Sequence, residues 1–297
     1  MKVLIICLSF RNNTGSELYY FELGRQLVKL GCHVCVLSQL KDGGDLWKKA
    51  EKEGIPCFDF SQAPNIKFDI IIGSHRPVLE QLIAGKMYEP APIISINHSE
   101  IINLEFPVLD SRIVKYVAIR ESIKTFLLEK YFIDPDDVVL IYNPVNVNRF
   151  TPRKDRKKIE RKTVIFPATI DYLRRQSIEN LCQKAKDEDF DVIFIGKKQE
   201  GMDYLDEIKK GNKNVRWFPS TSSIENFYAM GTHTAGIMLG RTSIEGFFYG
   251  LPAIIYVVDK AGNVQTMEEM PVPSDMSIFD SRVVAKQIKE LCESIVK

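Results

Sequence analysis

Between two apolar runs the chain has the sequence Gly240-Arg241-Thr242-Ser243-Ile244-Glu245-Gly246-Phe247-Phe248-Tyr249-Gly250-Leu251-Pro252. It predicts the end of a strand at residues 237–239, a glycine turn and a short helix with Thr242 or Ser243 near its N-cap. The Gly-Leu-Pro stop leads into a second buried strand at residues 253–258. Backbone N–H groups and the positive end of the helix would face an anion above the sheet. Glu245 is placed either to bind ligand hydroxyls or only to complement the helix dipole.

Length and composition indicate a two-domain protein. The chain has 297 residues, of which 45% are hydrophobic, enough for a core in each of two domains. A formal charge of +1 argues against a dedicated polyanion binder, and no strong nucleic-acid signature is present.

The cysteines and apolar runs indicate a cytoplasmic protein. The six cysteines are scattered and mostly lie in apolar runs, which favours reduced thiols over a disulfide framework. Residues 32–35, Cys-His-Val-Cys, lie in a strand pattern, so we expect buried strand residues rather than a metal site. Residues 1–8 are too short an apolar run for a signal peptide, and no run approaches the roughly 20 residues of a membrane helix.

The order of apolar runs predicts an α/β protein with two Rossmann-like, doubly wound parallel-sheet domains. A strand, glycine loop, helix and strand follow one another from residue 3 to residue 37, a unit typical of parallel sheets. Residues 151–162 are charged and almost without apolar side chains, and the strand and helix pattern then restarts. We therefore expect an N-terminal, acceptor-side domain at 1–150, a linker at 151–162 and a donor-binding domain at 163–297, facing each other across a cleft. That cleft is the default ligand site. The last helix is expected at 280–297.

Two histidines follow strands of the first domain. His75 comes after the predicted strand 69–72, and His98 after the strand 93–96. Ligands of open parallel sheets collect at the carboxyl ends of strands, so both histidines lie where chemistry is expected, although either could be a buried structural residue. His75, Arg76 and Glu100 are the acceptor-side candidates.

Four segments match motifs of a known family in order and spacing. They are a loop and helix at 13–27, an Asn-Pro-Val-Asn and Phe-x-Pro segment at 143–152, a strand ending in glycine at 193–196, and residues 243–252. On these residues the chain resembles the retaining glycosyltransferases of family 4, which have the B-type glycosyltransferase fold. The resemblance covers nearly the whole chain.

The resemblance implies roles for single residues. Glu245 matches the glutamate that binds the ribose of the donor, and His98 matches a histidine that lies against the donor sugar; both are implied to be catalytic. Gly15 and Ser16 match a loop that approaches the donor diphosphate. The family uses nucleotide-sugar donors, commonly uridine diphosphate sugars, needs no metal or other cofactor and retains the anomeric configuration.

The chain departs from the family pattern at three places. The first glutamate of the Glu-x7-Glu motif is replaced by Ile237. The usual arginine and lysine that bind the diphosphate are missing, which leaves Arg174 or Arg175, with Arg241, as replacements. The family's final helix, which crosses back to the first domain, has little room before Lys297.

The expected reaction is glycosyl transfer with retention, without a metal. Charge that grows on the leaving diphosphate would be stabilised by Arg174, Arg175, Arg241 and the amides of Thr242 and Ser243, each interaction contributing roughly 1.5–3 kcal/mol. Alternatively, Arg174 and Arg175 only form a solvated helix start. The leaving phosphate can itself accept the proton of the acceptor hydroxyl, so no separate base is required.

Two other functions stay open. One is a sugar-nucleotide epimerase, for which only Glu100 and Glu105 offer carboxylates near the sugar. The other is a non-catalytic member that binds a nucleotide sugar, which the loss at Ile237 favours. The segment Asp189-Phe190-Asp191 precedes a strand, so we expect a turn rather than a metal site. The acceptor is unknown and could be a sugar, a lipid-linked sugar or a modified base bound by loops of the first domain.

Overall fold

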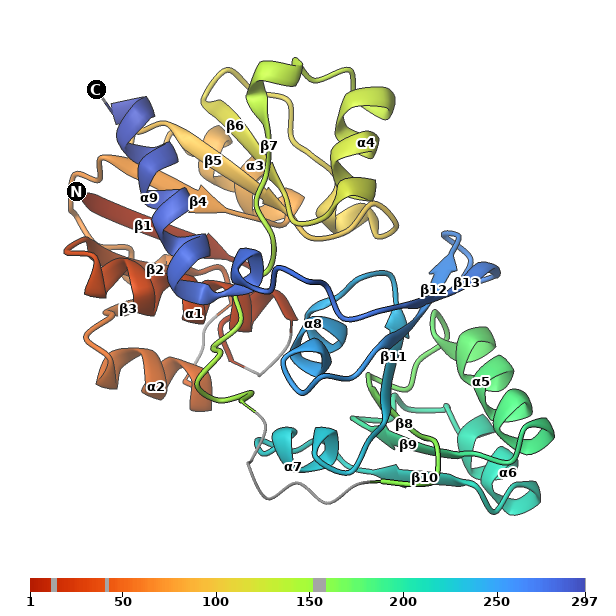
Figure 1. The fold of residues 1–297 in the computed structure, drawn as a ribbon. Helices are drawn as coiled ribbons and strands as arrows, with labels where there is room; N and C mark the ends of the chain where they lie inside the picture. Colours follow the sequence, from red (N-terminus) through yellow and green to blue (C-terminus); the bar gives the residue numbers. More distant parts are fainter. Residues whose placement is uncertain (12–14, 41–42, 152–158, 297) are drawn as a thin grey trace. The chain divides into compact units, whose positions relative to one another are not determined.

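A computed structural model describes residues 1–11, 15–40, 43–151 and 159–296. The chain forms two compact units (Figure 1). Unit 1 consists of Met1–Val145 and Ser277–Lys297, and unit 2 of Asn146–Met276. Each unit has its own sheet.

Unit 1 contains a seven-stranded parallel sheet with the order β3-β2-β1-β4-β5-β6-β7. The direction of strand order reverses between β1 and β4, which makes this pair the switch point where ligands bind in such sheets. The strands are β1 Lys2–Cys7, β2 His33–Ser38, β3 Cys57–Asp59, β4 Ile70–Gly73, β5 Ile93–Asn97, β6 Ile113–Ala118 and β7 Val138–Leu140, and the helices are α1 Gly15–Lys29, α2 Asp45–Lys52, α3 Arg76–Ala84, α4 Glu121–Lys130 and α9 Ser281–Val296.

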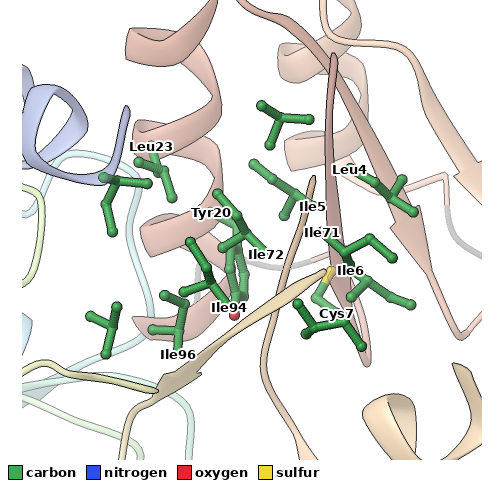
Figure 2. Packing of buried hydrophobic residues seen from close by; sticks show 14 of the residues in the cluster. Leu4, Ile5, Ile6, Cys7, Tyr20, Leu23, Ile71, Ile72, Ile94 and Ile96 are labelled. Atoms are coloured by element: carbon green, nitrogen blue, oxygen red, sulfur yellow. The ribbon is translucent and has the colours of Figure 1, made fainter. Parts of the chain in front are cut away.

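The core of unit 1 explains why its central strands are continuous apolar runs. The five residues from Val3 to Cys7 in β1 have no exposed surface, because helices cover both faces of the sheet. Figure 2 shows Tyr20 and Leu23 of α1 among the isoleucines of β1, β4 and β5. The apolar side of α1 thus holds the start of this helix over the switch point.

The last helix belongs to unit 1, and the prediction that residues 280–297 lie in the second domain is wrong. The backbone at Val145 exchanges hydrogen bonds with Phe279 (2.8 Å) and Ser281 (2.9 Å). Gln26 of α1 donates to Ser281 Oγ at 3.2 Å, and α9 packs along α1 (Figure 1). The amphipathic pattern predicts the buried face of α9, including Ile288, but any apolar surface could cover such a face, so the pattern does not identify the sheet. Residues 146–150, expected in the first domain, belong to unit 2.

Unit 2 contains a six-stranded sheet with the order β10-β9-β8-β11-β12-β13. Its switch point lies between β8 and β11. The strands are β8 Thr163–Pro167, β9 Asp191–Ile195, β10 Val215–Phe218, β11 His233–Ile237, β12 Ala253–Val258 and β13 Val264–Met270, and the helices are α5 Arg175–Asp187, α6 Tyr204–Gly211, α7 Glu225–Tyr228 and α8 Arg241–Phe247.

The edge strand β13 departs from the all-parallel sheet that the sequence predicts. It pairs antiparallel with β12, and most of its residues are exposed. Asp259 closes the connecting turn by accepting the N–H groups of Ala261 (2.8 Å) and Asn263 (2.9 Å). The sequence gives little sign of β13, since an exposed edge strand needs no apolar run. None of the helices in the described ranges has the length and apolar content needed to span a bilayer.

Truncation of Ile288 to alanine tests the placement of α9. The side chain is fully buried in unit 1, so its loss should cost about 2–5 kcal/mol of unfolding free energy there. The two tryptophans report on different units, Trp47 in α2 and Trp217 in β10. In variants that keep only one tryptophan, we expect Ile288→Ala to lower the urea midpoint more at Trp47 than at Trp217.

The matched control is Ile178→Ala on α5, also fully buried, which should lower the Trp217 midpoint more. Equal shifts at both tryptophans, or a larger shift at Trp217 for Ile288→Ala, would contradict the assignment of α9 to unit 1.

Candidate functional site

His75 lies at the switch point of unit 1, directly after β4. Its Nδ1 accepts the backbone N–H of Leu8 at 3.4 Å and lies 3.1 Å from Ser74 Oγ. Its Nε2 lies 3.1 Å from Oε1 of Glu105, in the loop after β5. Because a backbone N–H can only donate, Nδ1 must hold a lone pair, and the ring proton therefore lies on Nε2 and is donated to Glu105.

His98 lies beside this pair, directly after β5. Its ring meets Tyr19 and Tyr20 of α1 edge-on, with centroid distances of 5.0 and 5.8 Å, and its centroid is 6.4 Å from that of His75. Burial lowers the pKa of His98 to about 4, which Glu105 opposes and which His75 and Arg120 reinforce. The ring is therefore neutral at pH 7, and its Nε2 is buried without a hydrogen-bond partner among the described residues.

Other predicted residues of unit 1 have partners nearby or lie apart from this cluster. Arg76 is exposed and pairs with Glu80 one turn along α3 (Nε to Oε1, 2.6 Å). Glu100 pairs with Arg120 and accepts from Ser122 Oγ at 2.8 Å. The predicted diphosphate loop is described only from Gly15, which begins α1 and is exposed, and Ser16, which is half-buried; residues 13 and 14 lie outside the described ranges.

In unit 2 the N-cap of α8 is Gly240, and Thr242 and Ser243 lie near it, as expected, although no side chain caps the helix. Gly240 has extended backbone angles and no side chain that could cap the helix. Thr242 and Ser243 lie inside the first turn. The carbonyl of Thr242 accepts from the hydroxyl of Tyr228 at 2.8 Å, and Ser243 Oγ is buried with no hydrogen-bond partner in the described part of the chain.

Glu245 is buried and bonded within unit 2. Its Oε1 accepts from Arg241 Nε at 2.8 Å, and its Oε2 accepts from Tyr228 at 3.3 Å. Both members of the ion pair are buried. Burial raises the pKa of Glu245, while Arg241, Arg149 and Tyr228 oppose this rise. The structure thus brings Arg241 and Glu245 together as one buried ion pair.

Arg174 and Arg175 begin α5, in the connection after β8. Arg174 pairs with Asp171, whose Oδ1 also accepts the backbone N–H of Arg174 at 3.0 Å. Arg175 is exposed, pairs with Glu179 (Nε to Oε1, 2.8 Å) and stands over the ring of Tyr204 at 5.3 Å. Arg174, Arg175 and Arg241 therefore all hold a carboxylate partner.

The Asp-x-Asp segment lies at the amino end of β9, as expected from the sequence. Asp189 has a left-handed backbone (φ 51°) in the turn before the strand. Arg161 bonds Asp189 (2.8 Å) and Asp191 (3.1 Å), and this pairing lowers the pKa of Asp189 to about 2. In the predicted basic linker, Arg161 is thus held by unit 2, and residues 152–158 lie outside the described part. Within the described ranges, no group of three or more His, Cys, Asp or Glu side chains could hold a metal ion.

The sequence pattern does not pair Glu105 with the histidines, and it does not single out Tyr19, Tyr20 or Tyr228. The sequence offers Glu105 a role only in an epimerase, although this residue follows His98 in the same loop. The three tyrosines are fully buried. Apolar periodicity assigns such side chains to the core, so only the structure shows what their rings and hydroxyls contact.

No protein-family model matches the chain, and no curated protein sequence matches it. Solved structures do match. They include a glycosyltransferase from Rickettsia africae ESF-5 (20% identity, TM-score 0.68, 99% of this chain and 88% of that chain). Anabaena Alr3699/HepE in complex with UDP-glucose matches with 15% identity and a TM-score of 0.76, over 99% of this chain and 100% of that chain.

An alpha-glucosyltransferase in complex with UDP matches over the whole of both chains, with 12% identity and a TM-score of 0.62. The chain has the B-type glycosyltransferase fold. The two Rossmann-like sheets predicted from the sequence are thereby confirmed, with β13 as the antiparallel exception.

The low pKa of His98 predicts a loss of stability in mild acid. The folded ring stays neutral down to about pH 4, while an unfolded histidine titrates near 6.5, so between these values the unfolded chain binds the extra proton. From pH 7 to pH 5 this linkage should remove about 2 kcal/mol of unfolding free energy.

Urea unfolding of the wild type and His98→Phe at the two pH values measures this loss. The variant should have the smaller pH dependence, and the His98 ring signals of the wild type should not titrate in NMR between pH 7 and pH 5. A ring that titrates near pH 6.5 contradicts the buried environment of His98.

Proposed function

We propose that the chain is a glycosyltransferase that moves a sugar from a nucleoside diphosphate donor, such as a uridine diphosphate sugar, to an acceptor hydroxyl. The observation that supports this most is that each unit has a buried pair of polar side chains at the carboxyl-end edge of its own sheet, near the switch point. The similar solved structures with this fold are glycosyltransferases. Retention and independence of metal are proposed on the resemblance to family 4. We also propose a cytoplasmic location.

The arginines of unit 2 differ in how exposed their ion pairs are, and this difference suggests different roles. An exposed pair contributes about 0–1 kcal/mol, so Arg175 can exchange Glu179 for a phosphate at little cost. Breaking the buried Arg241–Glu245 pair would leave an uncompensated charge, which typically costs about 3–5 kcal/mol. We therefore assign the diphosphate to Arg175, together with the neighbouring Arg174, whose pair with Asp171 is half-buried, and we propose that Arg241 holds Glu245.

Glu245 is proposed to bind the ribose hydroxyls. Its Oε1 is committed to Arg241, whereas its bond to Tyr228 through Oε2 is the longer one, at 3.3 Å. A carboxylate held on one side by a guanidinium remains an anion and keeps lone pairs for hydroxyl donors. The amides of Thr242 and Ser243 are proposed to face the phosphates.

His98 is proposed to contact the donor sugar as a neutral ring. A neutral imidazole has one donor and one acceptor nitrogen, which suits sugar hydroxyls, and it adds no second positive charge to the site. Gly15 and Ser16, at the start of α1, are proposed to approach the diphosphate. His75 and Glu100 are proposed on the acceptor side; Arg76, which is exposed, is proposed there as well.

In the proposed reaction the bond between the anomeric carbon and the leaving phosphate oxygen breaks, and the acceptor oxygen bonds to the same face of that carbon. The acceptor's proton passes to the leaving phosphate. The protein then has to stabilise the growing phosphate charge and orient both substrates. A second candidate is a non-catalytic nucleotide-sugar binder, which Ile237 at the first glutamate position favours.

Incubation with a panel of nucleotide sugars separates these functions. We expect release of a nucleoside diphosphate; interconversion of the donor would indicate an epimerase, and binding without either product a binding protein. Glu245→Ala and His98→Ala should each lower turnover at least tenfold, while Glu207→Ala, an exposed carboxylate of α6, should not. Wild-type turnover in both site variants would remove the roles assigned to Glu245 and His98.

Arg175→Ala tests the assignment of the diphosphate. Loss of a charge-assisted hydrogen bond of about 1.5–3 kcal/mol should weaken UDP binding in calorimetry by roughly ten- to a hundredfold. Arg161→Ala is the matched control, because Arg161 is also an exposed arginine paired with carboxylates but lies at the amino end of β9. Equal effects of the two changes would contradict a phosphate site after β8.

A further inference from the structure

Glu105 is a buried carboxylate that the proposed chemistry leaves without a role. It ends the short 3-10 helix Asn103–Glu105 in the loop after β5, and its side chain is 9% exposed, against 7% for its partner His75. Burial opposes ionisation, but the hydrogen bonds from the His75 ring and the His98 backbone outweigh it and lower the pKa of Glu105. The group is therefore an anion inside unit 1.

The Glu105–His75 pair joins three loops at the switch point. One nitrogen of the His75 ring receives the N–H of Leu8 from the end of β1, and the other donates to Glu105 after β5. His75 itself follows β4 and has a left-handed backbone with φ 67°. Such a conformation costs on the order of 1–3 kcal/mol and persists only where the surroundings hold it. The contacts of the His75 ring with Leu8 and Glu105 stabilise this backbone conformation.

Glu105 also acts on His98. A hydrogen bond from the backbone of His98 stabilises the Glu105 carboxylate. The other contacts of the His98 ring in this cluster are the edges of Tyr19 and Tyr20, which leave its Nε2 without a partner in the described part of the chain. Edge-on aromatic contacts restrict the tilt of a ring but do not select which nitrogen it presents. The directional contact of Glu105 is with the backbone of His98, from which the ring projects.

We propose that Glu105 is a positioning residue of this site: it fixes the Nε2–H tautomer of His75 and, through the loop after β5, the orientation in which the His98 ring meets its ligand. The part of this proposal that concerns turnover rests on the proposed glycosyltransferase function. The part that concerns the two rings does not.

Histidine ring ¹⁵N NMR of the wild type and three variants tests the positioning directly. In the wild type, His75 should be a single Nε2–H tautomer. Glu105→Ala removes the acceptor that holds the ring against the N–H of Leu8, so the ring can turn, and we expect mixed tautomers at His75 and shifted ring signals at His98. Glu105→Gln keeps a carbonyl acceptor and should restore the wild-type tautomer. Ser74→Ala is the matched control, since it removes the other side-chain contact of His75 and leaves the N–H of Leu8 in place.

Turnover provides the second readout. We expect Glu105→Ala to lower kcat at least tenfold with the donor KM within about threefold, and Glu105→Gln to recover most of kcat. If Glu105 had only a structural role, Glu105→Ala would lower stability without lowering kcat selectively over KM.

Three outcomes overturn the proposal: an Nδ1–H tautomer of His75 in the wild type, unchanged ring signals in Glu105→Ala, or a tautomer change in Ser74→Ala equal to that in Glu105→Ala. The first needs no variant and so stands even if Glu105→Ala does not fold. Ring signals that change as expected in a protein without transferase activity would support the positioning role and count against the proposed function alone.

Discussion

The need to pair buried charge at the carboxyl ends of the strands constrains both units. A buried ionised group is tolerated only when it is paired and hydrogen-bonded. In unit 1 the pair is His75 and Glu105, and in unit 2 it is Arg241 and Glu245. Each pair lies beside the switch point of its sheet. The pair in unit 1 joins two loops, whereas the pair in unit 2 lies within α8.

Exposure separates two kinds of ion pair in the structure. The buried pairs are costly to open, so they fix geometry and suit residues that must keep one orientation. The exposed Arg175–Glu179 pair is worth little in water, so its guanidinium is free to exchange partners. If the proposed donor site is correct, this contrast makes Arg175 the arginine best able to pair with a diphosphate.

The sequence was sufficient for the parts of the fold that depend on continuous burial. Central strands such as β1 and β12, and helices such as α1, were predicted to within a few residues because their apolar runs have the right length and period. The sheet to which an element belongs was not predictable in two cases. The apolar face of α9 could have packed on either sheet, and β13 has no apolar run at all.

The same limit applies to the site. The positions of His75, His98 and Glu245 after strands or at a glycine turn could be inferred from local pattern alone. Their partners could not, because the contact of His75 with Glu105 and that of Glu245 with Tyr228 depend on how separate loops and helices pack. Tyr19 and Tyr20 illustrate this, since a tyrosine that is fully buried is indistinguishable in sequence from an ordinary core residue.

Hydrogen–deuterium exchange with and without UDP tests most directly whether a nucleoside diphosphate binds at the carboxyl ends of the strands of unit 2. We expect slower exchange of the backbone amides at residues 238–243 and 171–176, after β11 and β8, and unchanged exchange at residues 188–191, at the amino end of β9. No protection at either carboxyl-end segment, or protection confined to residues 188–191, would contradict this expectation.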